Sequence, residues 1–378
     1  MRELAVPLRR WQAAGTEYAL ATLIGVRGSA PRPIGTSMAV DAAGTVHGSL
    51  SGGCVEAAVH DLCLEVLETG RPARKSFGYS DSDAFAVGLT CGGEVEVFVH
   101  RVTAAEFAAV EAALAADMPM AWVRDLESGA VLAAGPRDAL GVGFDLDGAD
   151  LAVLRLARDM LDAGSSGVRV IGCGDRERTV FVHTFAPPPR MIVFGTTDFA
   201  SALCAVGRLL GYHVTVCDAR RTFLDRERFA AAHEVVVQWP HRYLSGTAVD
   251  GRTVICVLAH DPKFDIPVLT AALRLPVAYV GAMGSRRADR VRRAELRAAG
   301  VTEAQLRQLR SPIGLHLGGR TPEETALAIG AEIVALRRGG SGASLSATGR
   351  PIHGGGVYRW SRWCGGVFPW LTFRRTQC

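Results

Sequence analysis

A repeated alternation of short apolar strands and longer amphipathic segments, between residues 191 and 338, constrains the fold of this chain most strongly. The pattern predicts strands at 191–194, 213–217, 234–237, 254–258 and 277–280. A helix is expected at 197–210, and a last helix begins at Thr321-Pro322-Glu323-Glu324, a capping box with proline at the first helical position. Strands that alternate with helices favour a doubly wound parallel sheet, so we expect a Rossmann-like domain at 190–338.

Residues 1–185 have a different pattern, which predicts a separate mixed α/β domain. We expect strands at 18–28, 36–40, 46–50 and 94–102, and helices at 55–69, 104–116 and 151–162. Gly70 follows the first of these helices at the position of a C-terminal cap. The run Ala186-Pro187-Pro188-Pro189 forms a stiff hinge before the Rossmann-like domain.

A third segment, 339–378, joins a linker rich in glycine and serine to a basic, aromatic tail. Residues 359–378 hold three of the six tryptophans, two cysteines and four arginines. Two interpretations of the tail stay open: a peptide that docks on a partner or a membrane surface, and an extension without a selected role.

The composition excludes several classes of protein. Apolar residues make up 48% of the chain, which is enough for sizeable cores, and no run of 18 apolar residues predicts a membrane span. The net charge is +4, and arginines after residue 337 account for this excess, so nothing indicates nucleic-acid binding. The nine cysteines form no CxxC pair and no signal peptide is expected, so the sequence predicts reduced thiols in the cytoplasm.

The most informative motif is Ser51-Gly52-Gly53-Cys54, at the start of the predicted helix 55–69. Two glycines at a helix N-terminus let backbone N–H groups point at an anion, and the helix dipole adds a favourable potential. The same dipole is expected to lower the pKa of the Cys54 thiol. The motif therefore predicts a site for a phosphorylated small molecule that carries a metal or sulfur, with Cys54 as the candidate metal contact. The alternative is a turn of small residues that only packs.

A second turn with a cysteine, Cys91-Gly92-Gly93, precedes the predicted strand 94–102. If the two turns meet, two thiols converge on one pocket, which the sequence alone does not decide. Burial is expected for five other cysteines, which lie on apolar stripes or in strands: Cys63, Cys173, Cys204, Cys217 and Cys256.

The turn after the strand 191–194 stands where a dinucleotide-binding fingerprint would be. Gly195 and Ala200 satisfy its first and last positions, and Thr196 follows the first glycine. However, Thr197 occupies the middle position, where a glycine would let pyrophosphate approach, and Asp198 adds a negative charge nearby. A working nucleotide site and a lost or reshaped one both remain open.

Three other groups follow predicted strands at the carboxyl edge, where ligands bind in such sheets. Asp218 is well placed for a ribose 2′-hydroxyl, and His260-Asp261, with Asp265 close behind, comes after the fourth strand. The loop Gly284-Ser285-Arg286-Arg287 follows the fifth strand and is a candidate phosphate site at a helix N-terminus. A capped loop histidine and an ordinary solvated helix start are the alternatives.

Longer strings carry a family resemblance across residues 15–338: Gly28-Ser29-Ala30-Pro31-Arg32-Pro33, Gly48-Ser49-Leu50-Ser51-Gly52-Gly53-Cys54-Val55-Glu56, Leu64-Glu65-Val66-Leu67-Glu68-Thr69-Gly70, Thr90-Cys91-Gly92-Gly93, Tyr279-Val280-Gly281-Ala282-Met283-Gly284-Ser285-Arg286-Arg287, Ser311-Pro312-Ile313-Gly314-Leu315 and Gly319-Arg320-Thr321-Pro322-Glu323-Glu324. With these strings the chain resembles the XdhC/CoxI family, accessory proteins of molybdenum hydroxylases such as xanthine dehydrogenase and carbon monoxide dehydrogenase. Family members often have Gly-Ala-Gly-His at the Rossmann turn, where this chain has Gly195-Thr196-Thr197-Asp198.

The resemblance implies a cytoplasmic chaperone that binds molybdenum cofactor (molybdopterin) and keeps it intact while its terminal sulfur is installed. The chaperone then delivers the cofactor to the large subunit of a molybdenum hydroxylase. The resemblance also implies a homodimer and contact with a cysteine desulfurase. On this interpretation the residues that hold the cofactor are Ser51, Gly52, Gly53, Cys54, Glu56, Cys91, Gly92 and Gly93.

Two other functions stay open. An NAD(P)-dependent oxidoreductase related to xanthine dehydrogenase would use the Rossmann-like domain, with Asp218, His260 and Arg286 at its site. A sulfur relay through Cys54 would make the protein partly catalytic in sulfuration of the cofactor. Neither a middle glycine nor an identifiable acid–base pair supports the oxidoreductase.

Overall fold

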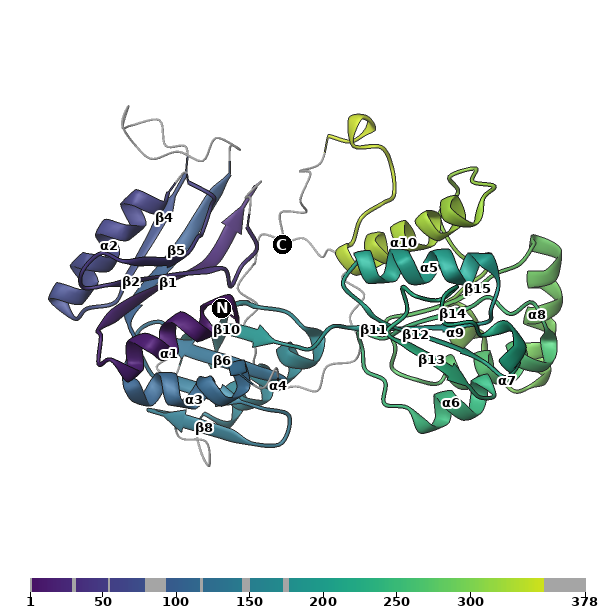
Figure 1. Cartoon of the computed structure of the whole chain (residues 1–378), viewed down its shortest axis with the longest axis horizontal. Helices are drawn as coiled ribbons and strands as arrows, with labels where there is room; N and C mark the ends of the chain where they lie inside the picture. Colours follow the sequence, from purple (N-terminus) through teal and green to yellow (C-terminus); the bar gives the residue numbers. More distant parts are fainter. Residues whose placement is uncertain are drawn as a thin grey trace. The chain divides into compact units, whose positions relative to one another are not determined.

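The computed structural model describes residues 2–28, 32–53, 55–78, 93–115, 118–144, 150–172 and 177–349. The chain forms two compact units, one that runs to Ala186 and one from Pro187 to Arg350 (Figure 1). Cys54, Cys91, Gly92, Cys173 and the tail beyond residue 349 lie outside the described residues. No helix within the described ranges is long and apolar enough to cross a membrane.

The first unit contains two antiparallel sheets of five strands each. The first sheet has the order β3-β2-β1-β5-β4, with bounds β1 Tyr18–Arg27, β2 Ser37–Asp41, β3 Val46–Gly48, β4 Ala73–Phe77 and β5 Glu94–Arg101. Helix α2 (Glu56–Thr69) covers one face of this sheet (Figure 1). Val59 and Val66 of α2 pack there against alternate residues of β1 and β5.

The second sheet has the order β8-β7-β6-β10-β9, with bounds β6 Met120–Asp125, β7 Val131–Ala134, β8 Ala139–Val142, β9 Gly167–Ile171 and β10 Arg178–Phe185. Helix α4 (Leu151–Ala163) covers one face through Leu154 and Leu161. The other face shares a core with the first sheet, where Leu20 and Trp122 belong to one cluster. Helices α1 (Ala5–Ala13) and α3 (Ala104–Ala115) lie beside this core.

The second unit is a parallel sheet, as predicted, and β16 adds a sixth strand to the five predicted ones, in the order β13-β12-β11-β14-β15-β16. Its strands are β11 Arg190–Phe194, β12 His213–Asp218, β13 Glu234–Val237, β14 Val254–Val257, β15 Tyr279–Ala282 and β16 Leu309–Arg310. Its helices are α5 Asp198–Leu209, α6 Pro240–Gly246, α7 Pro262–Ala272, α8 Arg286–Ala298, α9 Glu303–Leu306 and α10 Pro322–Arg338. Helices α5 and α10 cover one face, and α6 to α9 cover the other (Figure 1).

Two predicted strands differ from the structure for a local reason. The strand expected at 277–280 is β15 at Tyr279–Ala282, because parallel pairing with β14 aligns Val254 with Tyr279. The strand expected at 46–50 ends at Gly48, because the amide of Leu50 turns to the side chain of Glu56.

Candidate functional site

The turn that precedes α2 is organised around one carboxylate. Glu56 Oε1 accepts hydrogen bonds from the amides of Leu50, Ser51 and Gly52 at 3.2, 2.8 and 2.8 Å. The same oxygen accepts a hydrogen bond from Ser49 Oγ at 2.8 Å. One oxygen atom therefore holds the first half of the turn.

The second oxygen of this carboxylate holds the other half. Glu56 Oε2 accepts hydrogen bonds from Ser51 Oγ at 2.5 Å, from the Gly53 amide at 2.8 Å and from the Val55 amide at 3.2 Å. Gly53 and Val55 flank Cys54, so the backbone on either side of that cysteine is fixed to the same atom.

The amides of Gly52 and Gly53 both donate to Glu56 in this structure, and their contact with a ligand anion stays a prediction. Partial burial acts to raise the pKa of Glu56, but hydrogen bonds from Ser51, Ser49 and Gly52 outweigh burial and hold the pKa well below its usual range. A stable negative charge thus already lies at the N-terminus of α2.

The outer face of the turn is open. Gly52 and Gly53 are exposed and have backbone φ angles of +85° and +131°, which favour glycine. A Cβ atom at either residue would meet no heavy atom of the described chain within 4 Å. Within the described ranges, no side chain lies in the way of a ligand that approaches this backbone.

The cysteine predictions divide between described and undescribed residues. Whether the two cysteine turns converge stays a prediction, since Cys54, Cys91 and Gly92 are outside the described ranges, while Gly93 is buried just before β5. Burial is confirmed for four of the five cysteines assigned to the cores: Cys63, Cys204, Cys217 and Cys256.

In the second unit, Gly195 lies at the point where the strand order reverses between β11 and β14. Its φ is +114°, and a Cβ there would come within 2.8 Å of the backbone of Leu258 and Ala259. Only glycine fits this close approach of two loops, as expected for the first position of the fingerprint.

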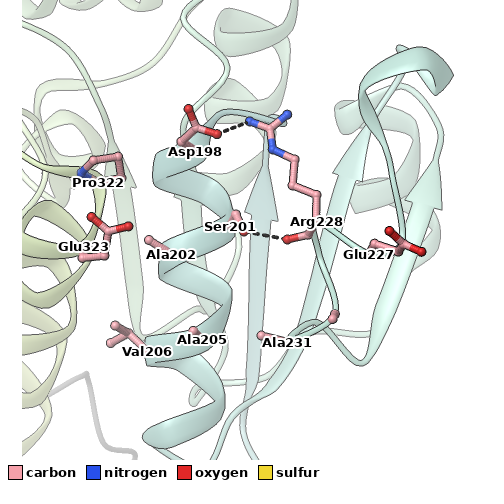
Figure 2. Close-up of a pocket in the computed structure, with 11 residues that line it drawn as sticks. Asp198, Ser201, Ala202, Ala205, Val206, Glu227, Arg228, Ala231, Pro322 and Glu323 are labelled. Carbon is pink, nitrogen blue, oxygen red and sulfur yellow. Dashed lines mark hydrogen bonds and ion pairs between the residues drawn. The ribbon is translucent and has the colours of Figure 1, made fainter.

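The N-terminus of α5, where pyrophosphate would lie, is occupied by the chain's own groups. Thr197 is the N-cap, and its hydroxyl accepts a hydrogen bond from the Ala200 amide at 3.3 Å. Asp198 follows and turns outward to Arg228, with 2.8 Å between its Oδ1 and a guanidinium nitrogen (Figure 2). A ligand phosphate would have to compete with this carboxylate for the helix terminus.

Asp218 also has partners within the chain. Its carboxylate, 2% exposed, accepts hydrogen bonds from the Arg220 amide and guanidinium at 2.8 to 3.0 Å and from Thr196 Oγ1 at 3.1 Å. Burial acts to raise the pKa of Asp218, but these bonds lower it overall. The guanidinium of Arg220 also lies over the rings of Phe223 and Phe264. A ribose hydroxyl would therefore meet an acid that is already paired.

The loop after β14 carries an exposed histidine. His260 has φ +58° and is the non-glycine residue with left-handed backbone in the described part of the chain. Asp261 is the N-cap of α7, accepting from the Lys263 amide at 3.2 Å, and its carboxylate pairs with Lys263 Nζ at 3.1 Å. Asp261 thus acts as the N-cap of α7.

The loop after β15 covers a buried ion pair that the sequence patterns did not indicate. Arg292 Nη2 lies 3.3 Å from Asp265 Oδ2, and Arg292 also donates to Ser311 Oγ and to the Met283 carbonyl. Burial raises the pKa of Asp265, while Arg292 opposes the shift. A Cβ at Gly284 would lie 3.3 Å from Arg292, so this glycine lets the loop pass close above the guanidinium.

Ser285, which follows Gly284, is the N-cap of α8, and its hydroxyl accepts a hydrogen bond from the Ala288 amide at 3.1 Å. Arg286 and Arg287 are exposed in its first turn, and neither guanidinium has a hydrogen bond or an ion pair with another described residue. These two side chains are free to contact an anion.

A groove of about 650 Å³ lies elsewhere on the second unit, beside α5 (Figure 2). Its sides come from the start of α10 and from Glu227 and Arg228, and Ser201 Oγ donates to the Arg228 carbonyl at 2.6 Å. None of the candidate binding residues lines it. Among the described residues, no group of three or more His, Cys, Asp or Glu side chains could hold a metal ion.

Sequence reasoning missed the roles of Glu56 and Arg292. Glu56 is the first residue of α2 and Val55 is the N-cap, so its bonds to the preceding amides differ from a capping box, whose carboxylate stands at the third helical position. Arg292 lies four residues before the buried Leu296 on α8, and an arginine on an apolar stripe was the only signal for it.

Each of the two units matches a domain of one protein family. The XdhC and CoxI family matches residues 11–78, which include the turn before α2. The XdhC Rossmann domain matches residues 191–333, from β11 into α10. The chain belongs to the XdhC and CoxI family.

Relatives of known name are similar over most of the chain. The chain is 26% identical over 324 residues to the molybdenum cofactor insertion chaperone PaoD of Escherichia coli, which covers 86% of this chain and 85% of PaoD. It is also 26% identical over 330 residues to a probable xanthine dehydrogenase subunit of Bacillus subtilis, covering 85% of this chain and 94% of that one. A crystal structure from Bacillus halodurans, described as a xanthine dehydrogenase, has a TM-score of 0.60 at 22% identity, over 91% of this chain and 98% of that chain, which shows the fold alone.

Proposed function

We propose that this protein is a chaperone that binds molybdenum cofactor and inserts it into a molybdenum enzyme of the xanthine dehydrogenase type. The similarity to PaoD, which spans both units and 86% of the chain, carries this proposal. The cofactor is cargo here, and the large subunit of the enzyme is the receiving partner. A cytoplasmic location, a homodimer and a cysteine desulfurase as sulfur donor belong to the same proposal.

The open turn before α2 supports a binding site in the first unit. The exposed backbone of Gly52 and Gly53 leaves room for a ligand, and Cys54 supplies a thiol at a helix start. Gly93 and Cys91 belong to the second turn of the proposed site. On the second unit, the exposed Arg286 and Arg287 are a separate candidate for binding an anion.

An oxidoreductase that uses NAD(P) is the less favoured function. Thr197 and Asp198 occupy the pyrophosphate position, and Arg220 pairs with Asp218. These contacts disfavour a dinucleotide at the switch point of the sheet.

One binding experiment separates the two functions. Purified protein is titrated with molybdenum cofactor and, separately, with NADH. Stoichiometric capture of the cofactor, weakened about tenfold or more in Cys54→Ala, supports the chaperone, since a metal–thiolate contact contributes at least that much. Tight NADH binding with turnover of a substrate, unchanged in Cys54→Ala, would overturn it.

A further inference from the structure

We propose that Glu56 is a positioning residue that fixes the Ser49–Gly53 turn from inside, so that a ligand meets the outer face of the turn and not its amides. This inference rests on the proposed function only for the identity of the ligand. It revises the sequence-based expectation that Glu56 contacts the cofactor.

More hydrogen-bond donors surround the carboxylate of Glu56 than it has lone pairs to accept them. Five amides and two hydroxyls donate to its two oxygens, which offer about four lone-pair sites. Each amide has a single hydrogen, and those of Gly52 and Gly53 point at Glu56, so neither is directed at a ligand phosphate.

The negative charge of Glu56 also disfavours a ligand phosphate at these amides. The carboxylate lies at the N-terminus of α2, where the helix dipole stabilises one negative charge. Its pKa is far below the usual value, so the charge persists at any physiological pH. A phosphate that approached the same amides would meet like charge, and so the turn receives another part of the ligand.

The shape of the turn requires an internal anchor. Gly52 and Gly53 both have positive φ and are exposed. Glycine loses more backbone entropy on folding than any other residue. Without an anchor such a segment has little to hold it. Glu56 Oε2 ties the backbone on both sides of Cys54, through the amides of Gly53 and Val55. The anchor thus fixes the backbone of the two residues that precede and follow Cys54 in the sequence.

The test measures amide hydrogen exchange of the peptide that covers residues 49–55, in the full-length protein without ligand. The variants are Glu56→Ala and Glu56→Gln, and Glu68→Gln is the matched control, because Glu68 is an exposed acid on the same helix. We expect exchange to accelerate about tenfold or more in both Glu56 variants, since each amide loses a hydrogen bond to a charged acceptor. The control should exchange like the wild type.

Chemical rescue separates this role from a general loss of structure. Acetate should restore slow exchange in Glu56→Ala by filling the vacated cradle, whereas chloride at the same ionic strength should not. Exchange in Glu56→Ala equal to wild type, or acceleration that spreads over all of α2 and is not rescued by acetate, would overturn the inference.

A second readout uses the cofactor itself. Glu56→Gln should weaken cofactor binding, Glu56→Asp should retain part of the affinity, and Glu68→Gln should not change it. Faster exchange with unchanged affinity would contradict the claim that the fixed turn serves the ligand. If wild-type protein fails to bind the cofactor, the proposed function fails, while the exchange and rescue results still decide whether Glu56 positions the turn.

Discussion

Two buried histidines between the sheets of the first unit show how single residues couple its stability to pH. His183 of β10 is buried, and burial lowers its pKa to about 3. His100 of β5 lies 3.0 Å from Glu106, and burial lowers its pKa well below 6.5, with a smaller contribution from Arg124. Both side chains are therefore neutral in the folded protein at physiological pH.

Acid should destabilise the first unit. Below pH 6.5 the unfolded chain takes up protons that the folded unit excludes at His100 and His183, so its free energy of unfolding falls as pH decreases. Between pH 6.5 and 4.5, proton uptake at His183 should lower the free energy of unfolding of the wild type by about 2–3 kcal/mol, which is about 1.4 kcal/mol per pH unit. His183→Gln should not show this part of the loss. Chemical denaturation at several pH values measures this. His316→Gln, an exposed site, serves as control, and an unchanged pH slope in His183→Gln would refute the prediction.

A glycine beside the same histidine should tolerate no side chain. Gly35 has φ +91°, and a Cβ there would lie 2.6 Å from His183 Nε2. Gly35→Ala should therefore cost about 3 kcal/mol, from left-handed strain plus overpacking. Gly70 has φ +67° with no neighbour within 4 Å, so Gly70→Ala should cost only about 1 kcal/mol. Equal melting temperatures for the two variants would argue against this difference.

At the scale of elements, sequence patterns predicted the second unit better than the first. Its strands are short apolar runs between amphipathic helices, and parallel pairing leaves few alternatives for such a pattern. The second sheet of the first unit was not predicted as a sheet, because strands such as Val131–Ala134 and Ala139–Val142 are short and rich in alanine or glycine. β7 pairs with β6 and β8 pairs with β7, and the sheet is completed by the non-local pairing of β6 with β10.

The candidate site was only partly predictable for the same reason. The small-residue turn at 51–53 and the helix after it follow from local sequence. The bonds from the turn to Glu56 are local, but the identity of their acceptor depends on how the backbone turns, and the contact of Asp265 with Arg292 on another helix is a property of the tertiary structure. Composition and spacing did not indicate which polar groups would be satisfied internally.

The N-terminus of α5 yields a prediction about nucleotides. Because Thr197 caps the helix and Asp198 adds a negative charge, we expect no saturable NADH binding in a fluorescence titration of the wild type. Thr197→Gly should not create binding, since Asp198 remains. Saturable NADH binding by the wild type would show that the helix terminus accepts pyrophosphate despite these contacts.

For the whole molecule, the family matches lie within residues 11–333 and include no part of the tail. They end at residue 333, and the proposed binding turn lies in the first unit. Deletion of residues 351–378 should therefore leave cofactor affinity and the unfolding midpoint unchanged. Equilibrium titration and thermal unfolding of the shortened chain measure both. Weaker capture of the enzyme partner by the shortened chain would favour the docking interpretation of the tail, and weaker cofactor binding would contradict the prediction.

Handover of the cofactor tests the central claim most directly. Purified protein loaded with molybdenum cofactor is mixed with a cofactor-free molybdenum hydroxylase of the xanthine dehydrogenase type, and recovery of enzyme activity is followed over time. We expect the loaded protein to restore activity faster and further than the same amount of free cofactor, and Cys54→Ala to remove this advantage. Equal recovery with free cofactor, or full recovery with Cys54→Ala, would contradict the proposed function.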